Sequence, residues 1–366
     1  MFDKNLYRLL FQRLIILVLI SLAGPARAEQ QDESWPPAKL SSWEIFTITE
    51  NKLSLNREYL PYNVKLELFA DYAKKYRAIK VPVGKKIRAD ASGVLSYPEG
   101  TVLVKTFYYP SADTSPPNTS PALVQTLTRN IARDSSLIET RVLIKRGSVW
   151  QPLVYRWNKS KSDAELLNGG GLETISADSQ LEPQNFTYLI PSRHQCVDCH
   201  GGYDLSGDLA PLGPVIEQLN IEVKYASKAV NQLELWFLSG LLTLDTIPQN
   251  NTVLDTNSAR DYLHVHCGHC HNANGLASSS RLYLTRDIQN LYRLGVCKPP
   301  IAAGNASLGL KYDIVPGKPE KSLLLRRLSS VTPEVMMPEL GRSRVDQEGV
   351  DLVSAWIRQL SGICEK

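Results

Sequence analysis

The sequence predicts an α+β fold in which a mostly antiparallel β domain precedes a helical domain. β-branched and aromatic residues alternate with polar ones between residues 45 and 190, and turn signals such as Pro98-Glu99-Gly100 separate these runs. From residue 228 onward the hydrophobic pattern becomes helical. With 366 residues, 43% of them hydrophobic, the chain is long enough for two or three globular domains and is neither collagen-like nor disordered throughout.

The first 28 residues are typical of a signal peptide. Lys4, Arg8 and Arg13 precede an apolar run over residues 14–23, and Ala26 and Ala28 form a small-residue cleavage site. The run is about half of the roughly 20 residues that span a bilayer. We therefore expect cleavage after Ala28, export to the periplasm and no transmembrane span afterwards; the alternative is an uncleaved N-terminal anchor.

The remaining chain divides by composition. We expect a flexible lead-in over residues 29–44, a β-rich domain over 45–215, a helical connector over 216–250 and a second domain over 251–366. Most of the net charge of +4 belongs to the leader, so the near-neutral mature chain gives no reason to expect a nucleic-acid partner. The predicted strands include residues 64–68, 78–81, 101–107, 141–145 and 152–157. A helix is expected over residues 344–360, because four apolar residues there share one helical face: Val350, Val353, Ile357 and Leu360.

Two copies of C-x-x-C-H carry the chemistry. They are Cys196-Val197-Asp198-Cys199-His200 and Cys267-Gly268-His269-Cys270-His271. Each is the attachment signature of a c-type haem, because two thiols three positions apart reach the two vinyl groups of one porphyrin and the adjacent imidazole binds the iron. The sequence therefore predicts two covalently bound haem c groups, with His200 and His271 as iron ligands.

Other interpretations fit these cysteines less well. A zinc ribbon places its two pairs roughly 15–20 residues apart, whereas these pairs are about 70 residues apart and each precedes a histidine. A thioredoxin-like motif would occur once and would not explain the histidine in both copies. A pair of structural disulfides is possible in an exported chain, but this composition would rarely produce C-x-x-C-H by chance, so two copies favour haem attachment. Cys297 and Cys364 lie outside the motifs, and in an oxidising compartment they most simply form a disulfide that closes a loop of roughly 70 residues; two free thiols are the alternative.

The C-terminal part resembles the class I cytochromes c. The order of its features carries the resemblance: a C-x-x-C-H motif, a methionine before Pro338, and a terminal amphipathic helix. The resemblance implies that Met337 is the axial sulfur ligand of the second haem, with Met336 as the near alternative. Both methionines could instead fill the core.

All six histidines lie in or near the two motifs. Four of them are not part of C-x-x-C-H and could each be a distal ligand, or a structural or solvated histidine: His194, His264, His266 and His269. None remains elsewhere for a catalytic triad or a separate metal site.

Three stretches, residues 68–77, 97–107 and 336–343, resemble an uncharacterised family of bacterial diheme c-type cytochromes over about residues 45–360. The first half, with its P-x-G-T-x-x-x-K strand and terminal C-x-x-C-H, is similar to the cytochrome c′-beta and hydroxylamine-oxidising cytochrome family. That likeness implies a five-coordinate first haem and singles out Lys105 by motif position, although the favoured interpretation of Lys105 is an ordinary strand residue.

Two functions follow from these expectations. The first is a periplasmic electron carrier that moves single electrons between other exported redox proteins. The second is a redox enzyme or gas-binding protein with an open distal position at the first haem and the second haem as its relay. In a third interpretation the β domain binds a partner protein to which the haems deliver electrons.

Overall fold

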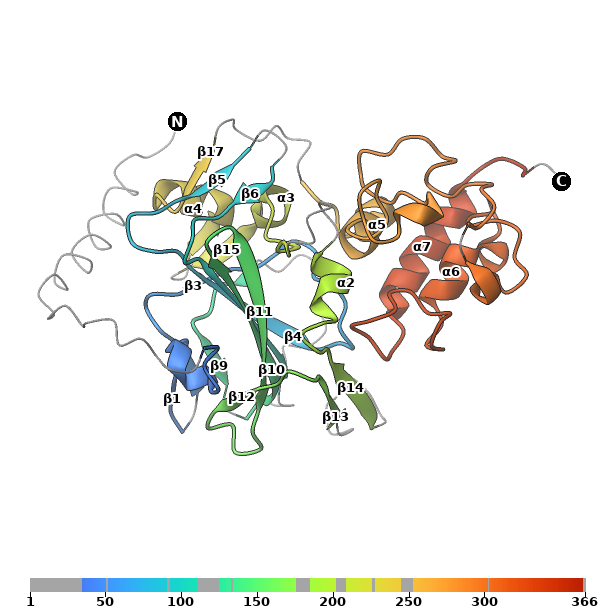
Figure 1. Ribbon diagram of the computed structural model, residues 1–366. Coiled ribbons are helices and arrows are strands. Elements are labelled where there is room, and N and C mark those ends of the chain that lie inside the picture. The colour runs from blue at the N-terminus through green and yellow to red at the C-terminus, as the bar shows by residue number, and fades with distance from the viewer. Residues whose placement is uncertain are drawn as a thin grey trace, which may run out of the picture.

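The computed structural model describes residues 35–50, 52–90, 93–110, 125–132, 134–175, 185–201, 209–225, 228–244, 253–301 and 303–364. The predicted signal peptide, residues 1–28, lies outside them. The chain is α+β as the sequence predicts: mostly antiparallel strands form the N-terminal part, and helices and loops form the C-terminal part. In Figure 1 the β-rich part is on the left, the helical part is on the right, and α2 (Cys196–His200) lies between them.

The largest sheet has six strands, and every neighbouring pair is antiparallel. Its order is β12 (Ala164–Leu166), β11 (Val149–Trp157), β10 (Ser136–Arg146), β7 (Val102–Tyr109), β4 (Lys74–Lys80) and β3 (Leu60–Pro61). Four of the predicted strands lie in this sheet. The predicted strand at residues 64–68 is wrong: the backbone N–H groups of Lys65 and Leu66 donate to the backbone and side-chain oxygens of Gln218, at 3.0 and 2.9 Å.

One face of this sheet packs against a small sheet of β1 (Phe46–Ile48), β2 (Lys52–Leu55) and β9 (Asn130–Ala132). The short helix η1 (Leu40–Trp43) joins the same core through Leu40, which is only 3% exposed. Ser41 donates from its backbone N–H and its hydroxyl to the Asp163 carboxylate, at 3.0 and 2.8 Å. The expectation of a flexible lead-in is therefore wrong for residues 35–44. This segment is mostly polar, but Leu40 packs in the core and Ser41 binds Asp163, which is distant in sequence.

The opposite face of the sheet carries two separate apolar clusters. At one end Ile79 and Leu103 pack with residues of α3 (Ile216–Leu219) and α4 (Gln232–Leu238). At the other end Phe107 packs with Tyr188 of β14 (Phe186–Ile190), which pairs with β13 (Gly171–Ile175). Because side chains alternate along a strand, Lys105 lies on this face between Leu103 and Phe107.

The expected helical connector at residues 216–250 is wrong in part, because strands alternate with its two short helices. β15 (Glu222–Tyr225) pairs with β16 (Lys228–Asn231) and, in parallel, with β8 (Gln125–Thr126). β17 (Leu242–Leu244) pairs in parallel with β5 (Ile87–Ala89), which also pairs with β6 (Leu95–Ser96). Runs of three or four residues show too little periodicity to reveal strands whose partners are far away in sequence.

The helical part has α5 (Ala259–Cys267), α6 (Leu323–Leu328) and α7 (Gln347–Gln359), with short turns η3 (Ser278–Ser280), η4 (Gly304–Ser307) and η5 (Pro319–Lys321). α7 is the helix expected over residues 344–360, and it begins where the Asp346 carboxylate accepts from the Gly349 N–H at 3.1 Å. A disulfide joins Cys297 to Cys364. None of the helices in the described ranges is both long and apolar enough to cross a bilayer.

Gly349 lets α7 approach α5 closely. A Cβ at this position would lie 2.2 Å from the hydroxyl oxygen of Tyr262 on α5, whose hydroxyl donates to Asp346 at 2.8 Å. Although alanine is a better helix former by about 1 kcal/mol, we predict that Gly349→Ala lowers the free energy of unfolding by about 1–3 kcal/mol. Denaturant unfolding followed by circular dichroism measures this. The control Gly169→Ala, with no atom within 4 Å of its added Cβ, should unfold like the wild type, and equal stability of both variants would contradict the prediction.

Candidate functional site

α2 carries the whole first C-x-x-C-H motif. It follows β14 directly, after a turn in which the Cys196 N–H donates to the Arg193 carbonyl at 3.3 Å. Cys196 packs against the apolar cluster around Phe107 and Tyr188, which holds α2 against the sheet. Helical geometry places the thiols of Cys196 and Cys199 on one face, because residues three positions apart are neighbours on a helix.

The imidazole of His200 is oriented by the backbone. Its Nδ1 lies 2.8 Å from the carbonyl oxygen of Ala210, which can only accept, so Nδ1 carries the proton and Nε2 keeps its lone pair. Burial lowers the pKa of His200 to about 4, and the positive charges of Lys105 and Arg141 add to the shift. A neutral imidazole with a free Nε2 is the form that binds a metal ion.

The second motif begins at the end of α5. Cys267 is the last residue of that helix, and the His271 N–H donates to its carbonyl at 2.8 Å in the turn that follows. A cavity opens here, lined by Cys267, His271, Met337 and mostly aliphatic side chains such as Leu284 and Leu328. A mostly apolar lining with a few polar or sulfur-bearing side chains is typical of cofactor and small-molecule sites.

Met337 stands in a loop, residues 335–345, that we call the methionine loop. The Met337 N–H donates to the Arg327 carbonyl at 3.1 Å, and the Arg342 guanidinium donates to the Met337 carbonyl at 2.7 Å. Met336 is not among the residues that line the cavity. The structure thus brings Met337, His271 and Cys267 to one cavity.

The two motifs touch each other. The Sγ of Cys270 lies 3.8 Å from the backbone carbonyl oxygen of Asp198, inside the first motif. Burial raises the pKa of the Cys270 thiol to about 12, and the neighbouring Cys199 thiol raises it further. His269, in the second motif, is also close enough to His200 to lower its pKa, although its effect is smaller than those of burial, Lys105 and Arg141. Segments about 70 residues apart in sequence therefore meet at one place in the fold.

The four other histidines lie in different surroundings. His194 is exposed before α2, and His269 is partly buried with no hydrogen-bond partner for its Nδ1 among the described residues. His266 stacks on Tyr262 with ring centroids 4.1 Å apart, and its Nδ1 lies 3.0 Å from the Tyr262 carbonyl oxygen. His264 contacts Glu217 with its Nε2, at 2.7 Å.

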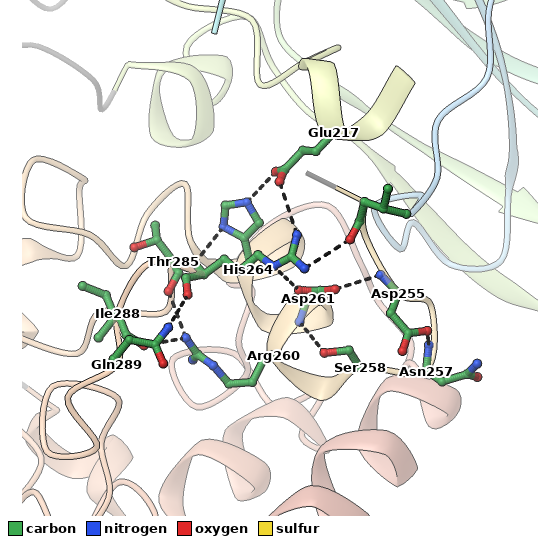
Figure 2. Close-up of polar contacts among 12 residues, drawn as sticks. Glu217, Asp255, Asn257, Ser258, Arg260, Asp261, His264, Thr285, Ile288 and Gln289 are labelled. Atoms are coloured by element: carbon green, nitrogen blue, oxygen red, sulfur yellow. Dashed lines mark hydrogen bonds and ion pairs between the residues drawn. The ribbon is translucent and has the colours of Figure 1, made fainter. Parts of the chain in front are cut away.

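Glu217 joins the β-rich part to the helical part. Figure 2 shows its carboxylate, on α3, aimed at His264 on α5. The Arg286 guanidinium lies 3.9 Å from the same carboxylate. Arg286 in turn contacts the Asp261 carboxylate at 3.1 Å, and Asp261 accepts from the Asp255 N–H at 2.8 Å. This network fixes the helix that delivers the second motif.

Three cations cross the main sheet in one row beneath the first motif. Arg77, Lys105 and Arg141 stand directly opposite one another on β4, β7 and β10, and we call them the cationic row. The Arg141 guanidinium donates twice to the Glu139 carboxylate, at 2.9 and 2.5 Å, and Arg77 donates to Glu67 at 2.8 Å.

Lys105 has no carboxylate partner within ion-pair distance in the part of the chain that the structure describes. Its ammonium lies 5.9 Å from the ring centroid of Phe107. Burial, together with the like charges of Arg77 and Arg141, lowers the pKa of Lys105 to about 7. Directly opposed like charges destabilise a sheet, so the row gathers an excess of positive charge that an anionic group would relieve.

The residues present fit two haem c groups: each motif supplies two thiols and an imidazole, and the second cavity adds a thioether. The four motif cysteines form no disulfides, and no cluster of three or more His, Cys, Asp or Glu side chains within the described ranges could hold a metal ion. The sequence did not point to Glu217 or to the cationic row. Strand register aligns the three cations, packing between distant segments places Glu217 beside α5, and no local motif marks either. Comparison with family models, with curated proteins and with solved structures finds no match for this chain.

Proposed function

We propose that this chain is an exported diheme c-type cytochrome that transfers single electrons between redox proteins. The observation that carries the proposal is the contact between the two C-x-x-C-H motifs, with Cys270 Sγ 3.8 Å from the Asp198 carbonyl. When bound at such motifs, haem iron supplies one-electron redox chemistry. Adjacent attachment sites favour transfer inside one molecule.

The chain's own residues would hold the two groups as follows. Cys196, Cys199 and His200 form the first site on α2, and Cys267, Cys270 and His271 form the second at the end of α5. Met337 lines the second cavity together with His271 and offers its thioether there. A thioether ligand opposite histidine raises a reduction potential and fills the sixth position, which suits electron transfer better than substrate binding.

Export and partners belong to the same proposal. The N-terminal sequence is typical of a signal peptide, and the disulfide between Cys297 and Cys364 is compatible with an oxidising compartment. In the periplasm the partners would be other exported redox proteins. The sequence resemblance to uncharacterised bacterial diheme cytochromes supports the same class.

A second candidate function is favoured by the cationic row. The sheet places Lys105 and Arg141 close enough to lower the pKa of His200, and Arg77 lies beside Lys105 in the same row; none of these side chains is a histidine or a methionine. A first haem with an open distal position would make the protein a redox enzyme or a gas-binding protein, with the second haem as its relay.

Haem content tests the central proposal. We predict two haems per chain in the pyridine haemochrome assay. Replacing both Cys267 and Cys270 by alanine should leave one, because each motif attaches one group. The matched control replaces Cys297 and Cys364, which lie outside the motifs, and should keep two. Any other wild-type stoichiometry would refute the diheme assignment.

The axial methionine has its own spectroscopic test. We predict that Met337→Ala abolishes the weak far-red absorption band that arises from sulfur bound to ferric iron, because Met337 lines the cavity beside His271. Met336→Ala, one residue away, should retain the band. Survival of the band in Met337→Ala would exclude Met337 as the ligand.

Carbon monoxide and nitric oxide separate the two candidate functions. For an electron carrier we expect optical and EPR spectra of two low-spin haems that neither gas changes. A change at one haem only, with the far-red band intact, would favour the second candidate, because it places an open position at the first site.

A further inference from the structure

Asp71 of the β-rich part holds the methionine loop of the helical part. Its carboxylate is buried, and it accepts from the backbone N–H of Ser343 at 2.8 and 2.9 Å and from the N–H of Arg344 at 2.9 Å. The Ser343 hydroxyl lies 2.9 Å from the same carboxylate. Three donors thus converge on a side chain about 270 residues away in sequence, and a carboxylate suits them because both of its oxygens only accept.

The hydrogen bonds continue from Asp71 to Met337. Arg342, which is 4% exposed, donates to the carbonyl of Arg344 at 2.9 Å and to the carbonyl of Met337 at 2.7 Å. The hydrogen bonds therefore connect the Asp71 carboxylate, through the backbone of Ser343 and Arg344 and the buried guanidinium of Arg342, to Met337, which lines the second cavity. Bonds to charged groups are the stronger class of hydrogen bond, and two charged groups stand in this path.

The backbone at Asp71 is itself unusual. Asp71 and Tyr72 have φ values of +51° and +63°, a conformation that non-glycine residues rarely adopt. The Asp71 carbonyl accepts from the Tyr109 hydroxyl at 2.6 Å, and the Tyr72 hydroxyl donates to the Val345 carbonyl at 3.0 Å. Such strain persists only where the surroundings enforce it, and here it directs two successive side chains at the methionine loop.

We propose that Asp71 is a positioning residue through which the β-rich part fixes Met337 at the second haem site. This inference rests on the proposed function, because it assumes that Met337 is an iron ligand. It gives the β-rich part a defined role in the second site, about which the sequence alone is silent.

Displacement of the methionine by imidazole tests the inference in the full mature holoprotein. Imidazole is titrated into the ferric protein, and the concentration that halves the far-red band is measured. In Asp71→Asn the amide NH₂ faces backbone donors in place of an acceptor, so the loop is held less firmly. We expect the halving concentration to fall about tenfold, the change that follows from losing one hydrogen bond to a charged acceptor. Ser343→Ala, which removes the hydroxyl contacts with Asp71 and with the Thr187 carbonyl but keeps both backbone donors, should give a smaller fall in the same direction.

Glu217→Gln is the matched control, because it alters another polar contact between the two parts that does not involve the methionine loop. Its halving concentration should equal that of the wild type. An equal fall in Glu217→Gln and Asp71→Asn would overturn the inference, since it would show a general loss of docking. An unchanged value in a folded Asp71→Asn with two haems would overturn it as well.

A different result would show that the proposed iron ligands, and not the role of Asp71, are wrong. A wild-type protein with two haems and no far-red band would show that methionine is not bound, which removes the group that Asp71 is inferred to position. In the double variant Asp71→Asn/Met337→Ala, imidazole affinity at the second haem should match that of Met337→Ala alone. A further tenfold change would show that Asp71 acts by another route.

Discussion

The contact between α2 and the turn after α5 is the constraint on which the other features depend, because each motif belongs to a different part of the chain. α2 has only five residues and cannot persist as an isolated helix, so it must be held by the sheet on which Cys196 packs. α5 is held by its own apolar core and by Glu217, which reaches His264 and Arg286 from the β-rich part. The distance between the motifs is thus set by how the two parts dock, and the polar contacts of Asp71 and Glu217 carry that docking at separate places.

Charge is distributed unevenly between the two candidate sites. The first motif lies over a sheet face on which Arg77, Lys105 and Arg141 outnumber the carboxylates of Glu67 and Glu139. Glu139 is fully buried, and its two bonds from Arg141 and one from Tyr188 are what make a buried guanidinium tolerable there. The second cavity is lined mostly by aliphatic side chains and a thioether. Net charge and axial ligation are two of the factors that set the reduction potential of a haem, so two haems bound as proposed would be subject to a different one at each site.

Local patterns predicted much of this architecture. The C-x-x-C-H motifs, the disulfide partners Cys297 and Cys364, the central strand β7 and the helix α7 are visible in the sequence because each depends on neighbouring residues or on residue chemistry alone. The strand expected at residues 64–68 failed because Gln218 takes its backbone donors, and residues 35–44 are ordered by Leu40 and Asp163. The contacts of Asp71 and the alignment of the cationic row could not be predicted, because they depend on strand register and on packing between segments that are distant in sequence.

The contacts of the β-rich part bear on whether it is a separate partner-binding module or a scaffold for the two candidate sites. One face of its main sheet packs against the small sheet and η1, and the other packs against residues of α3, α4, β14 and α2. Its polar residues Asp71, Glu217 and Lys105 are directed at the methionine loop, at α5 and at the first motif respectively. These three residues link the β-rich part to both candidate sites, which favours a role for it as their scaffold.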